Sequence, residues 1–128
     1  GVRSAVNNLH AMGMTLGIVT SKMRDTAFRG LAVCGYDAAV FEILIGADDV
    51  AEHKPSPVPI LAALARLNVV PAGVVYVGDS PHDMNAGRAA EVTTAAVRWG
   101  PFPDEILAPT KPDIWIDDPV ELRTLAGS

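Results

Sequence analysis

Residues 74–83 read VVYVGDSPHD, an apolar run that ends in glycine and gives way to a polar segment with two aspartates. The run predicts a parallel strand covered on both faces, and the residues after it predict a helix at about residues 83–90. Asp79 then stands at the carboxyl end of the strand, and Asp83 can turn back toward the same point. Two carboxylates there form a hard-oxygen site that suits Mg²⁺. The alternative is that both aspartates only form a turn and cap the helix.

Outward from this segment, runs typical of strands alternate with helical patterns in both directions along the chain. Strands are expected at residues 15–20, 41–46, 74–78, 93–99 and 114–116. Helices are expected at about residues 2–12, 24–33, 83–90 and 119–125, and from Pro57 through Leu67, whereas residues 100–112 have the proline-rich composition of a loop. This alternation predicts an α/β fold, a Rossmann-like doubly wound parallel sheet. Ligands of such sheets bind beyond the carboxyl ends of the strands.

Lys54 lies in residues 53–59 (HKPSPVP), a loop with three prolines that leads into a predicted helix capped by Ser56. Proline restricts the backbone and so limits the directions that the lysine side chain can take. A cation held in this way suits the neutralisation of a phosphate and an adjacent carboxylate. The alternative is a solvated lysine in an ordinary loop.

Thr20, Ser21 and Lys22 follow the apolar run LGIV at the same expected edge of the sheet. Hydroxyls and loop amides at such an edge can donate hydrogen bonds to phosphate oxygens. Taken alone, the tripeptide favours the alternative that Thr20 is a β-branched strand end and Ser21 a helix cap.

The composition indicates one globular domain with an acidic balance. The 128 residues are 49% hydrophobic and 20% charged, and the formal net charge is −5. Because no basic run is present, nucleic acid is not an expected partner. No apolar stretch reaches the roughly 18 residues of a membrane span, so no membrane association is expected either. The single cysteine, Cys34, is expected to be a buried small hydrophobe, and the predicted location is the cytoplasm.

Three motifs thus occur in one order: residues 20–22 (TSK), 54–57 (KPSP) and 78–83 (GDSPHD). With this order the chain resembles hydrolases of the haloacid dehalogenase superfamily, especially the phosphoglycolate phosphatase and pyrophosphatase-like branch, over nearly its whole length. The resemblance implies a magnesium-dependent phosphatase, in which an aspartate attacks phosphorus and water later hydrolyses the acyl phosphate.

Position by position, the resemblance implies the following roles. Thr20 would hydrogen-bond the transferring phosphoryl group, with Ser21 adding a contact beside it. Lys54 would balance the charge of nucleophile and phosphate. Asp79 would bind Mg²⁺ directly, and Asp83 would complete the metal site by orienting a metal-bound water or a neighbouring loop. Positioning and charge stabilisation of this kind are what phosphoryl transfer requires.

The chain also departs from the family. The family's first motif, a strand ending in Asp-x-Asp that carries the nucleophile, does not occur in residues 1–128, and neither does the helical cap domain. In the family that strand lies in mid-sheet, so its absence predicts a gap between two pairs of strands. We therefore expect residues 1–128 to be the C-terminal part of a catalytic core domain, inactive alone, whose sheet is completed by a missing N-terminal segment or a partner chain. A smaller departure is Glu91, where the branch usually has a helix-ending glycine.

The expected substrate is a small phosphorylated metabolite, with phosphoglycolate or pyrophosphate as the nearest candidates. A second enzymatic hypothesis keeps the fold and changes the reaction to phosphoglucomutase-type phosphoryl transfer. The non-enzymatic alternative is a module that retains magnesium and anion sites but serves binding or regulation.

Overall fold

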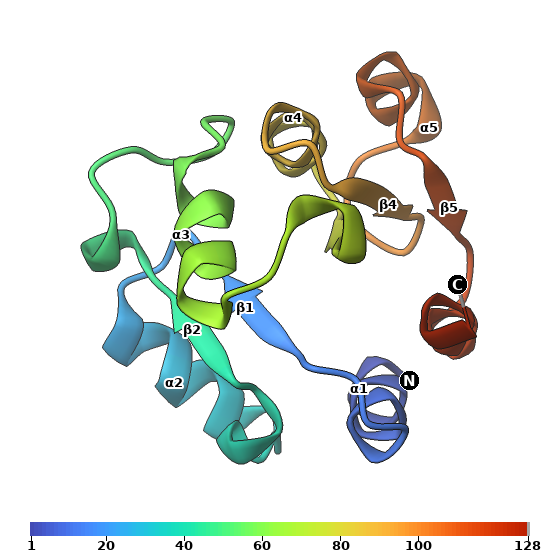
Figure 1. Ribbon diagram of the computed structural model, residues 1–128. Coiled ribbons are helices and arrows are strands. Elements are labelled where there is room, and N and C mark those ends of the chain that lie inside the picture. Colours follow the sequence, from blue (N-terminus) through green and yellow to red (C-terminus); the bar gives the residue numbers. More distant parts are fainter. Residues whose placement is uncertain (128) are drawn as a thin grey trace.

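The strands of the chain are parallel and fall into two separate sheets (Figure 1). We describe residues 1–127 in a computed structural model. In the first sheet, β1 (Gly17–Val19) pairs with β2 (Ile43–Ile45). In the second, β4 (Thr93–Val97) lies between β3 (Val75–Gly78) and β5 (Ile114–Ile116). Within residues 1–127 no strand of one sheet pairs with a strand of the other.

The expected α/β fold with parallel strands is therefore confirmed. The expected break in the sheet is also present, but it separates a pair of strands from a set of three. The difference arises because β5 adds to the far side of β4, with Ala95 opposite Ile114 and Val97 opposite Ile116.

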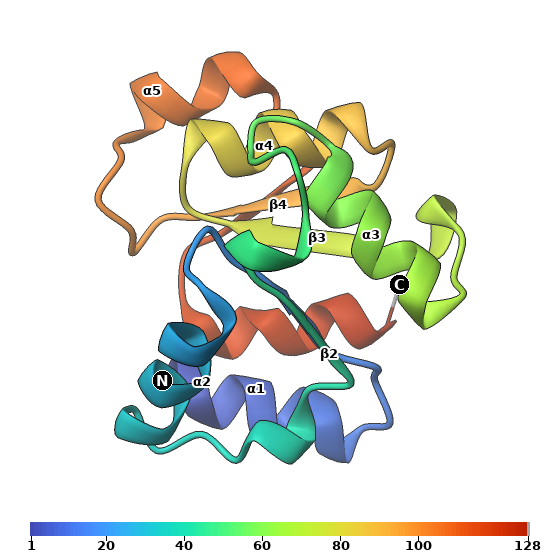
Figure 2. The same ribbon diagram turned by 90° about the vertical axis from the view of Figure 1, so that its left-hand side faces the viewer.

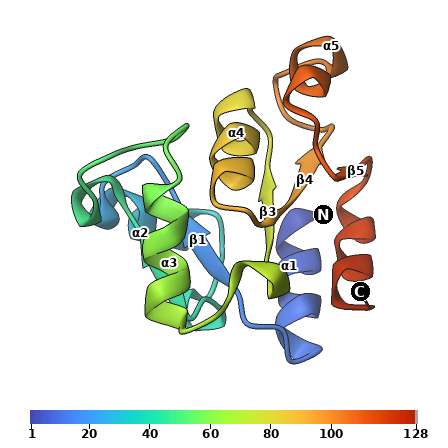
Figure 3. The same cartoon turned by 45° about the horizontal axis from the view of Figure 1, so that its top comes forward.

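Helices cover both faces of the strands, as a doubly wound fold requires (Figure 2). On one face lie α1 (Val2–Ala11), α2 (Arg24–Val33) and the 3₁₀ helix η5 (Pro119–Gly127). On the other lie α3 (Val58–Leu67), α4 (Pro81–Ala89) and α5 (Asp104–Leu107). Figure 3 shows α1 and η5 side by side, so both ends of the described chain lie on the same face.

The apolar half of β4, residues 95–97, is buried on both of its faces. Ala95 and Val97 belong to a buried cluster with residues of α1 and η5. Ala96, which points the other way, belongs to a second cluster with Met84 of α4 and Leu107 of α5. Because successive side chains of a strand alternate between faces, both faces of this half of the strand carry apolar residues, as expected for a strand covered on both sides.

Several local expectations are corrected by the structure. The expected loop at residues 100–112 contains α5 and a 3₁₀ turn, η4 (Ala108–Thr110), and the expected last helix is the 3₁₀ helix η5. The α4 helix begins earlier than expected because the Ser80 hydroxyl accepts a hydrogen bond from the Asp83 backbone N–H, at 3.1 Å. Further 3₁₀ turns are η1 (Ala38–Val40), η2 (Ala47–Asp49) and η3 (Pro71–Gly73).

The expectation that Cys34 is buried is wrong, since its thiol lies exposed just after α2. The reason is that α2 lies at the periphery and buries none of its residues fully. In the part of the chain that the structure describes, no helix has the length and apolar character needed to cross a bilayer.

Candidate active site

Lys54 connects the two sheets. Its ammonium nitrogen lies 2.7 Å from Asp83 Oδ1, 3.1 Å from the Tyr76 hydroxyl and 3.5 Å from the Val19 carbonyl oxygen. Val19 ends β1, whereas Tyr76 belongs to β3 and Asp83 to the first turn of α4. The proline-rich loop before α3 therefore places a single cation across the break between the sheets.

The Lys54–Asp83 pair is largely withdrawn from solvent, with side chains 13% and 12% exposed. Burial alone would lower the pKa of Lys54, but the neighbouring Tyr76 and Asp83 outweigh it and raise this pKa above its usual value. Burial alone would raise the pKa of Asp83, but the hydrogen bond and charge of Lys54 hold it below its usual value. Both shifts favour the charged forms, so the ammonium and carboxylate form an ion pair.

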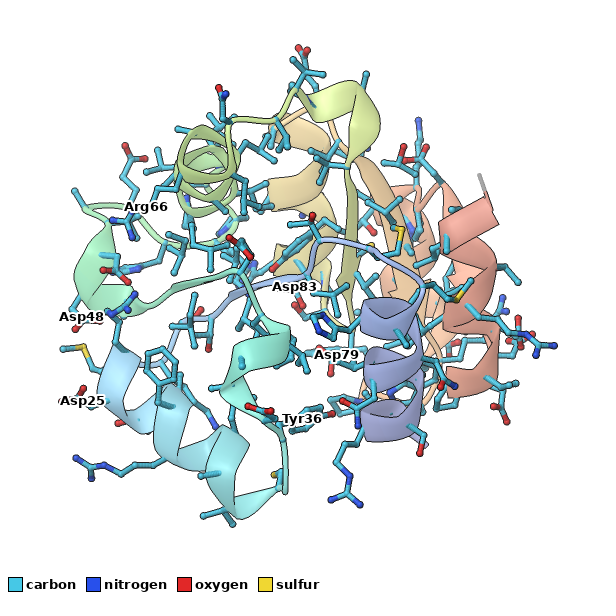
Figure 4. All side chains as sticks on the ribbon, turned by 60° about the horizontal axis from the view of Figure 1, so that its bottom comes forward. Asp25, Tyr36, Asp48, Arg66, Asp79 and Asp83 are labelled. Atoms are coloured by element: carbon cyan, nitrogen blue, oxygen red, sulfur yellow. The ribbon has the colours of Figure 1, made fainter. Side chains whose placement is uncertain are left out.

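Asp83 shapes the turn that carries Asp79. Its Oδ2 accepts a hydrogen bond from the Asp79 backbone N–H at 3.2 Å, while Oδ1 faces Lys54. The carboxylate lies so close to Gly78 that a Cβ at that position would be 2.8 Å from Asp83 Cγ. Both Asp83 oxygens are thus engaged, and only glycine at position 78 leaves room for them. Figure 4 shows the labelled Asp79 and Asp83 close together in the middle of the molecule.

The Asp79 carboxylate is free by comparison. Within residues 1–127 it forms no hydrogen bond or ion pair, although its side chain is partly buried at the carboxyl end of β3. The Gly100 backbone runs close beside it, since a Cβ on Gly100 would be 3.1 Å from Asp79 Oδ2. A partly buried carboxylate without a partner is a ready ligand for a cation.

The residues present fit Mg²⁺ as an ion that shares its ligands with substrate and water. Mg²⁺ typically takes one or two carboxylates and completes its shell with waters and phosphate oxygens. Asp79 supplies one such carboxylate, and Asp83 supports the turn that carries it by accepting a hydrogen bond from the Asp79 backbone N–H. No group of three His, Cys, Asp or Glu side chains gathers anywhere in residues 1–127, so the described part offers no site that would enclose a metal fully.

Thr20 follows the Val19 carbonyl that Lys54 contacts. Its backbone N–H donates to the Ile45 carbonyl at 2.9 Å, and its hydroxyl accepts from the Lys22 backbone N–H at 3.2 Å. Thr20 is therefore held at the same edge as Lys54. Ser21 is exposed, and its side chain forms no hydrogen bond with any other described residue. The structure thus brings Lys54, Asp79 and Asp83 together and places Thr20 directly after β1 at the same edge, whereas the Ser21 side chain forms no hydrogen bond within residues 1–127.

Tyr76 is a member of the site that the sequence alone does not single out. Its hydroxyl lies 3.1 Å from Lys54 Nζ and 3.3 Å from Asp83 Oδ1. Burial and the Asp83 charge raise the pKa of Tyr76 to about 12, so the phenol stays neutral. A neutral phenol can accept from the ammonium and donate to the carboxylate. The only signal in the sequence is a hydroxyl-bearing aromatic residue among the valines of VVYV.

A second polar cluster holds the neighbouring loops. The Arg24 guanidinium lies 3.1 Å from Asp49 Oδ2, which also accepts from the Gly46 backbone N–H at 2.7 Å. The Arg24 backbone N–H donates to Asp48 Oδ1 at 2.9 Å. The Gly46 hydrogen bond is the main reason that the pKa of Asp49 lies below its usual value. These contacts hold the start of α2 against the segment after β2. The Asp48 and Asp49 carboxylates therefore already have partners within the fold.

Comparison with known proteins supports the family suggested by this arrangement. The family model described as haloacid dehalogenase-like hydrolase matches residues 1–97. The chain therefore belongs to the haloacid dehalogenase-like hydrolases, as the three motifs predict.

Its relatives lie in the expected branch. The chain is 40% identical over 125 residues to the pyrophosphatase PpaX of Listeria monocytogenes, covering 98% of this chain and 57% of that protein. It is 39% identical over 117 residues to the putative pyrophosphatase PpaX of Caldanaerobacter subterraneus, covering 91% and 53%. The chain thus spans little more than half the length of the curated relatives that it matches.

Solved structures of the same fold are also matched over little more than half of their length. A putative phosphoglycolate phosphatase from Lactobacillus plantarum superposes with a TM-score of 0.87 at 31% identity, covering 98% of this chain and 58% of that one. A putative beta-phosphoglucomutase from Thermotoga maritima superposes with a TM-score of 0.86 at 26% identity, covering 99% and 58%. The same core is therefore found in proteins named for two different phosphoryl reactions.

Proposed function

We propose that this chain forms the C-terminal part of the catalytic core of a Mg²⁺-dependent phosphatase that hydrolyses a small phosphorylated metabolite through a phosphoaspartyl intermediate. The observation that carries the proposal is an unpaired carboxylate, Asp79, on the turn that Asp83 shapes, while Asp83 also holds the Lys54 ammonium in place. Phosphoryl transfer depends mainly on such placement of charge around the transferring group.

Each residue has a distinct part in this proposal. Asp79 holds Mg²⁺, which when bound withdraws charge from the phosphoryl oxygens. Lys54 neutralises the nucleophile and the phosphate, and its ion pair with Asp83 keeps it in place. Asp83 acts through the Asp79 backbone N–H and so sets the shape of the metal-binding turn. Thr20, with Ser21 beside it, donates hydrogen bonds to the phosphoryl oxygens.

The nucleophile is proposed to lie on a strand that completes the sheet between β1 and β3. Among residues 1–127 the two sheets share no pairing, so each has an open edge at which a strand can add. Lys54 already bridges the break, at the end where the carboxyl termini of the strands meet. A strand inserted there would bring an aspartate close to Lys54 and Asp79. It is supplied either by a segment of the same polypeptide outside residues 1–128 or by a partner chain.

Two substrates are favoured by the names of the relatives, pyrophosphate and phosphoglycolate. The second candidate function is phosphoglucomutase-type phosphoryl transfer, which the similarity to a putative beta-phosphoglucomutase supports. A non-enzymatic module that binds magnesium and anions on the same fold is the remaining alternative.

The test is hydrolysis of an aryl phosphate with and without Mg²⁺ by residues 1–128 and by a polypeptide extended at its N-terminus. We expect turnover only from the extended polypeptide and only with Mg²⁺. If the extended polypeptide binds Mg²⁺ and phosphate but does not turn over any phosphate ester, the binding module replaces the phosphatase. Activity with glucose phosphates but not with phosphoglycolate or pyrophosphate would favour the transferase.

A further inference from the structure

Tyr76 places a hydroxyl between the two charged partners of the site. Its ring packs from β3 against the buried cluster of α3 and α4 that includes Ile60, Leu64 and Ala86. The ring is therefore fixed by apolar contacts, and its hydroxyl is delivered to Lys54 at 3.1 Å and to Asp83 at 3.3 Å. The packing of the ring and the placement of the hydroxyl can be separated by experiment, because phenylalanine keeps the first and lacks the second.

The three acceptors around the Lys54 ammonium lie at different hydrogen-bond distances. Lysine offers three donors, and here the acceptors lie at 2.7 Å (Asp83), 3.1 Å (Tyr76) and 3.5 Å (Val19). The first two distances are ordinary for hydrogen bonds, whereas the third lies beyond the usual range. The N–H nearest the end of β1 is thus the one that is available to donate a hydrogen bond to a stronger acceptor.

We propose that Tyr76 is a positioning residue, whose hydroxyl together with Asp83 fixes two ammonium protons of Lys54 and directs the third toward the carboxyl end of β1, where Thr20 begins the proposed phosphate site. A lysine ammonium on its flexible stem is a point charge that one contact cannot orient. Two contacts on one side define where the third proton points. This role rests on the proposed function, since a phosphoryl oxygen or the nucleophile is the acceptor that would replace the Val19 carbonyl.

The first test compares Tyr76→Phe with Tyr36→Phe in the complete polypeptide that contains residues 1–128. Each variant loses one hydroxyl, but the Tyr36 ring packs on Phe41 and its hydroxyl forms no hydrogen bond in the described part of the chain. We expect Tyr76→Phe to lower kcat roughly tenfold, the order of loss that a small misplacement of a catalytic group produces, with KM changed less than about twofold. Tyr36→Phe is expected to retain wild-type kcat and KM.

A second readout does not depend on activity. The chain has three lysines, of which Lys22 and Lys111 are exposed and Lys54 is nearly buried. Modification by an amine-reactive reagent, followed by mass spectrometry, measures the rate at Lys54 against the other two. We expect Tyr76→Phe to raise the relative rate at Lys54 about threefold or more, because one of its anchors is lost. Tyr36→Phe is expected to leave it unchanged.

A third arm tests whether Tyr76 acts through Lys54. In a Lys54→Met background, Tyr76→Phe should lower kcat no further, because the group that it positions is absent. An active wild type with unchanged kcat and Lys54 labelling in Tyr76→Phe would overturn the role of Tyr76 alone. Equal loss of kcat in both backgrounds would also overturn it. A wild type that hydrolyses no phosphate ester would overturn the proposed function, and this role of Tyr76 with it.

Discussion

The Lys54 ammonium and the Asp83 carboxylate lie 2.7 Å apart and are both nearly buried. Lys54 precedes α3, and Asp83 lies in the first turn of α4, so the pair joins two segments that come from different crossovers of the fold. The same ammonium contacts the end of β1. The ion pair therefore both positions Lys54 at the candidate active site and contributes to the free energy of unfolding.

Removing the Lys54 charge while Asp83 remains is expected to destabilise the fold. Lys54→Met leaves the Asp83 charge buried without its partner, and we expect the free energy of unfolding to fall by about 3 kcal/mol, as for other buried pairs. In an Asp83→Asn background the same change is expected to cost less than about 1 kcal/mol, because no charge is then stranded. Urea unfolding of the four proteins measures both values. If Lys54→Met lowered the free energy of unfolding equally in the two backgrounds, the ion pair would contribute no interaction energy, and this prediction would be wrong.

The pair also predicts a dependence of stability on pH. The folded-state pKa of Asp83 lies below its ordinary value of 3.8, so its contribution is present above pH 3.8 and is lost as pH falls through the folded value. The folded-state pKa of Lys54 lies above 10.5, so its contribution is present below pH 10.5 and is lost as pH rises through the folded value. Urea unfolding as a function of pH should therefore show the stability advantage over Asp83→Asn shrinking at both extremes. An advantage that is constant from acid to alkali would contradict this assignment.

Gly78 is expected to be required because of Asp83. In Gly78→Ala the new Cβ would lie 2.8 Å from Asp83 Cγ and Oδ2, so the carboxylate must move. We expect a loss of about 1–3 kcal/mol in the free energy of unfolding. Gly30→Ala is the matched control, because nothing lies within 4 Å of a Cβ there and Gly30 is inside α2. That variant should gain about 0.5–1 kcal/mol. Chemical denaturation compares the two, and a tolerated Gly78→Ala would contradict the close contact.

Glu91 occupies a position that favours glycine. It follows α4 with a φ of 64°, in the left-handed region where a side chain is strained. We expect Glu91→Gly to raise the free energy of unfolding by about 0.5–1 kcal/mol. The same substitution in the first turn of α5, Glu105→Gly, should lower it by a similar amount, since glycine has a low helix propensity and the favourable charge near the helix N-terminus is lost. Thermal unfolding of both variants tests the contrast, and a loss of stability in Glu91→Gly would contradict it.

The sequence predicts the parts of this molecule that depend on local pattern. Strand β3 and the turn after it follow from the apolar run and the aspartates at residues 74–83, and the α/β class follows from the alternation of such runs. The cation at Lys54 follows from its proline-rich loop. These features are predictable because each is encoded within one short segment.

Features that depend on tertiary contacts are not predictable in this way. Tyr76 reads as one more apolar position of a strand, and its role emerges only when the loop that carries Lys54 packs across β3. The exposure of Cys34 depends on how little of α2 is covered, which its own sequence does not reveal. The 3₁₀ form of η5 likewise differs from the α-helix that its pattern suggests, since weak periodicity does not separate the two.

The most direct test of the central claim is the Mg²⁺ dependence of aryl phosphate hydrolysis in the complete polypeptide, compared between wild type and Asp79→Asn. Because the Asp79 carboxylate has no partner in residues 1–127, the substitution should leave thermal stability nearly unchanged. Glu105→Gln, which removes one exposed carboxylate elsewhere, is the control for charge. We predict Mg²⁺-dependent hydrolysis in wild type and in the control, and a loss of at least about 100-fold in Asp79→Asn. Hydrolysis by Asp79→Asn at the wild-type rate and with the same Mg²⁺ dependence would contradict the account.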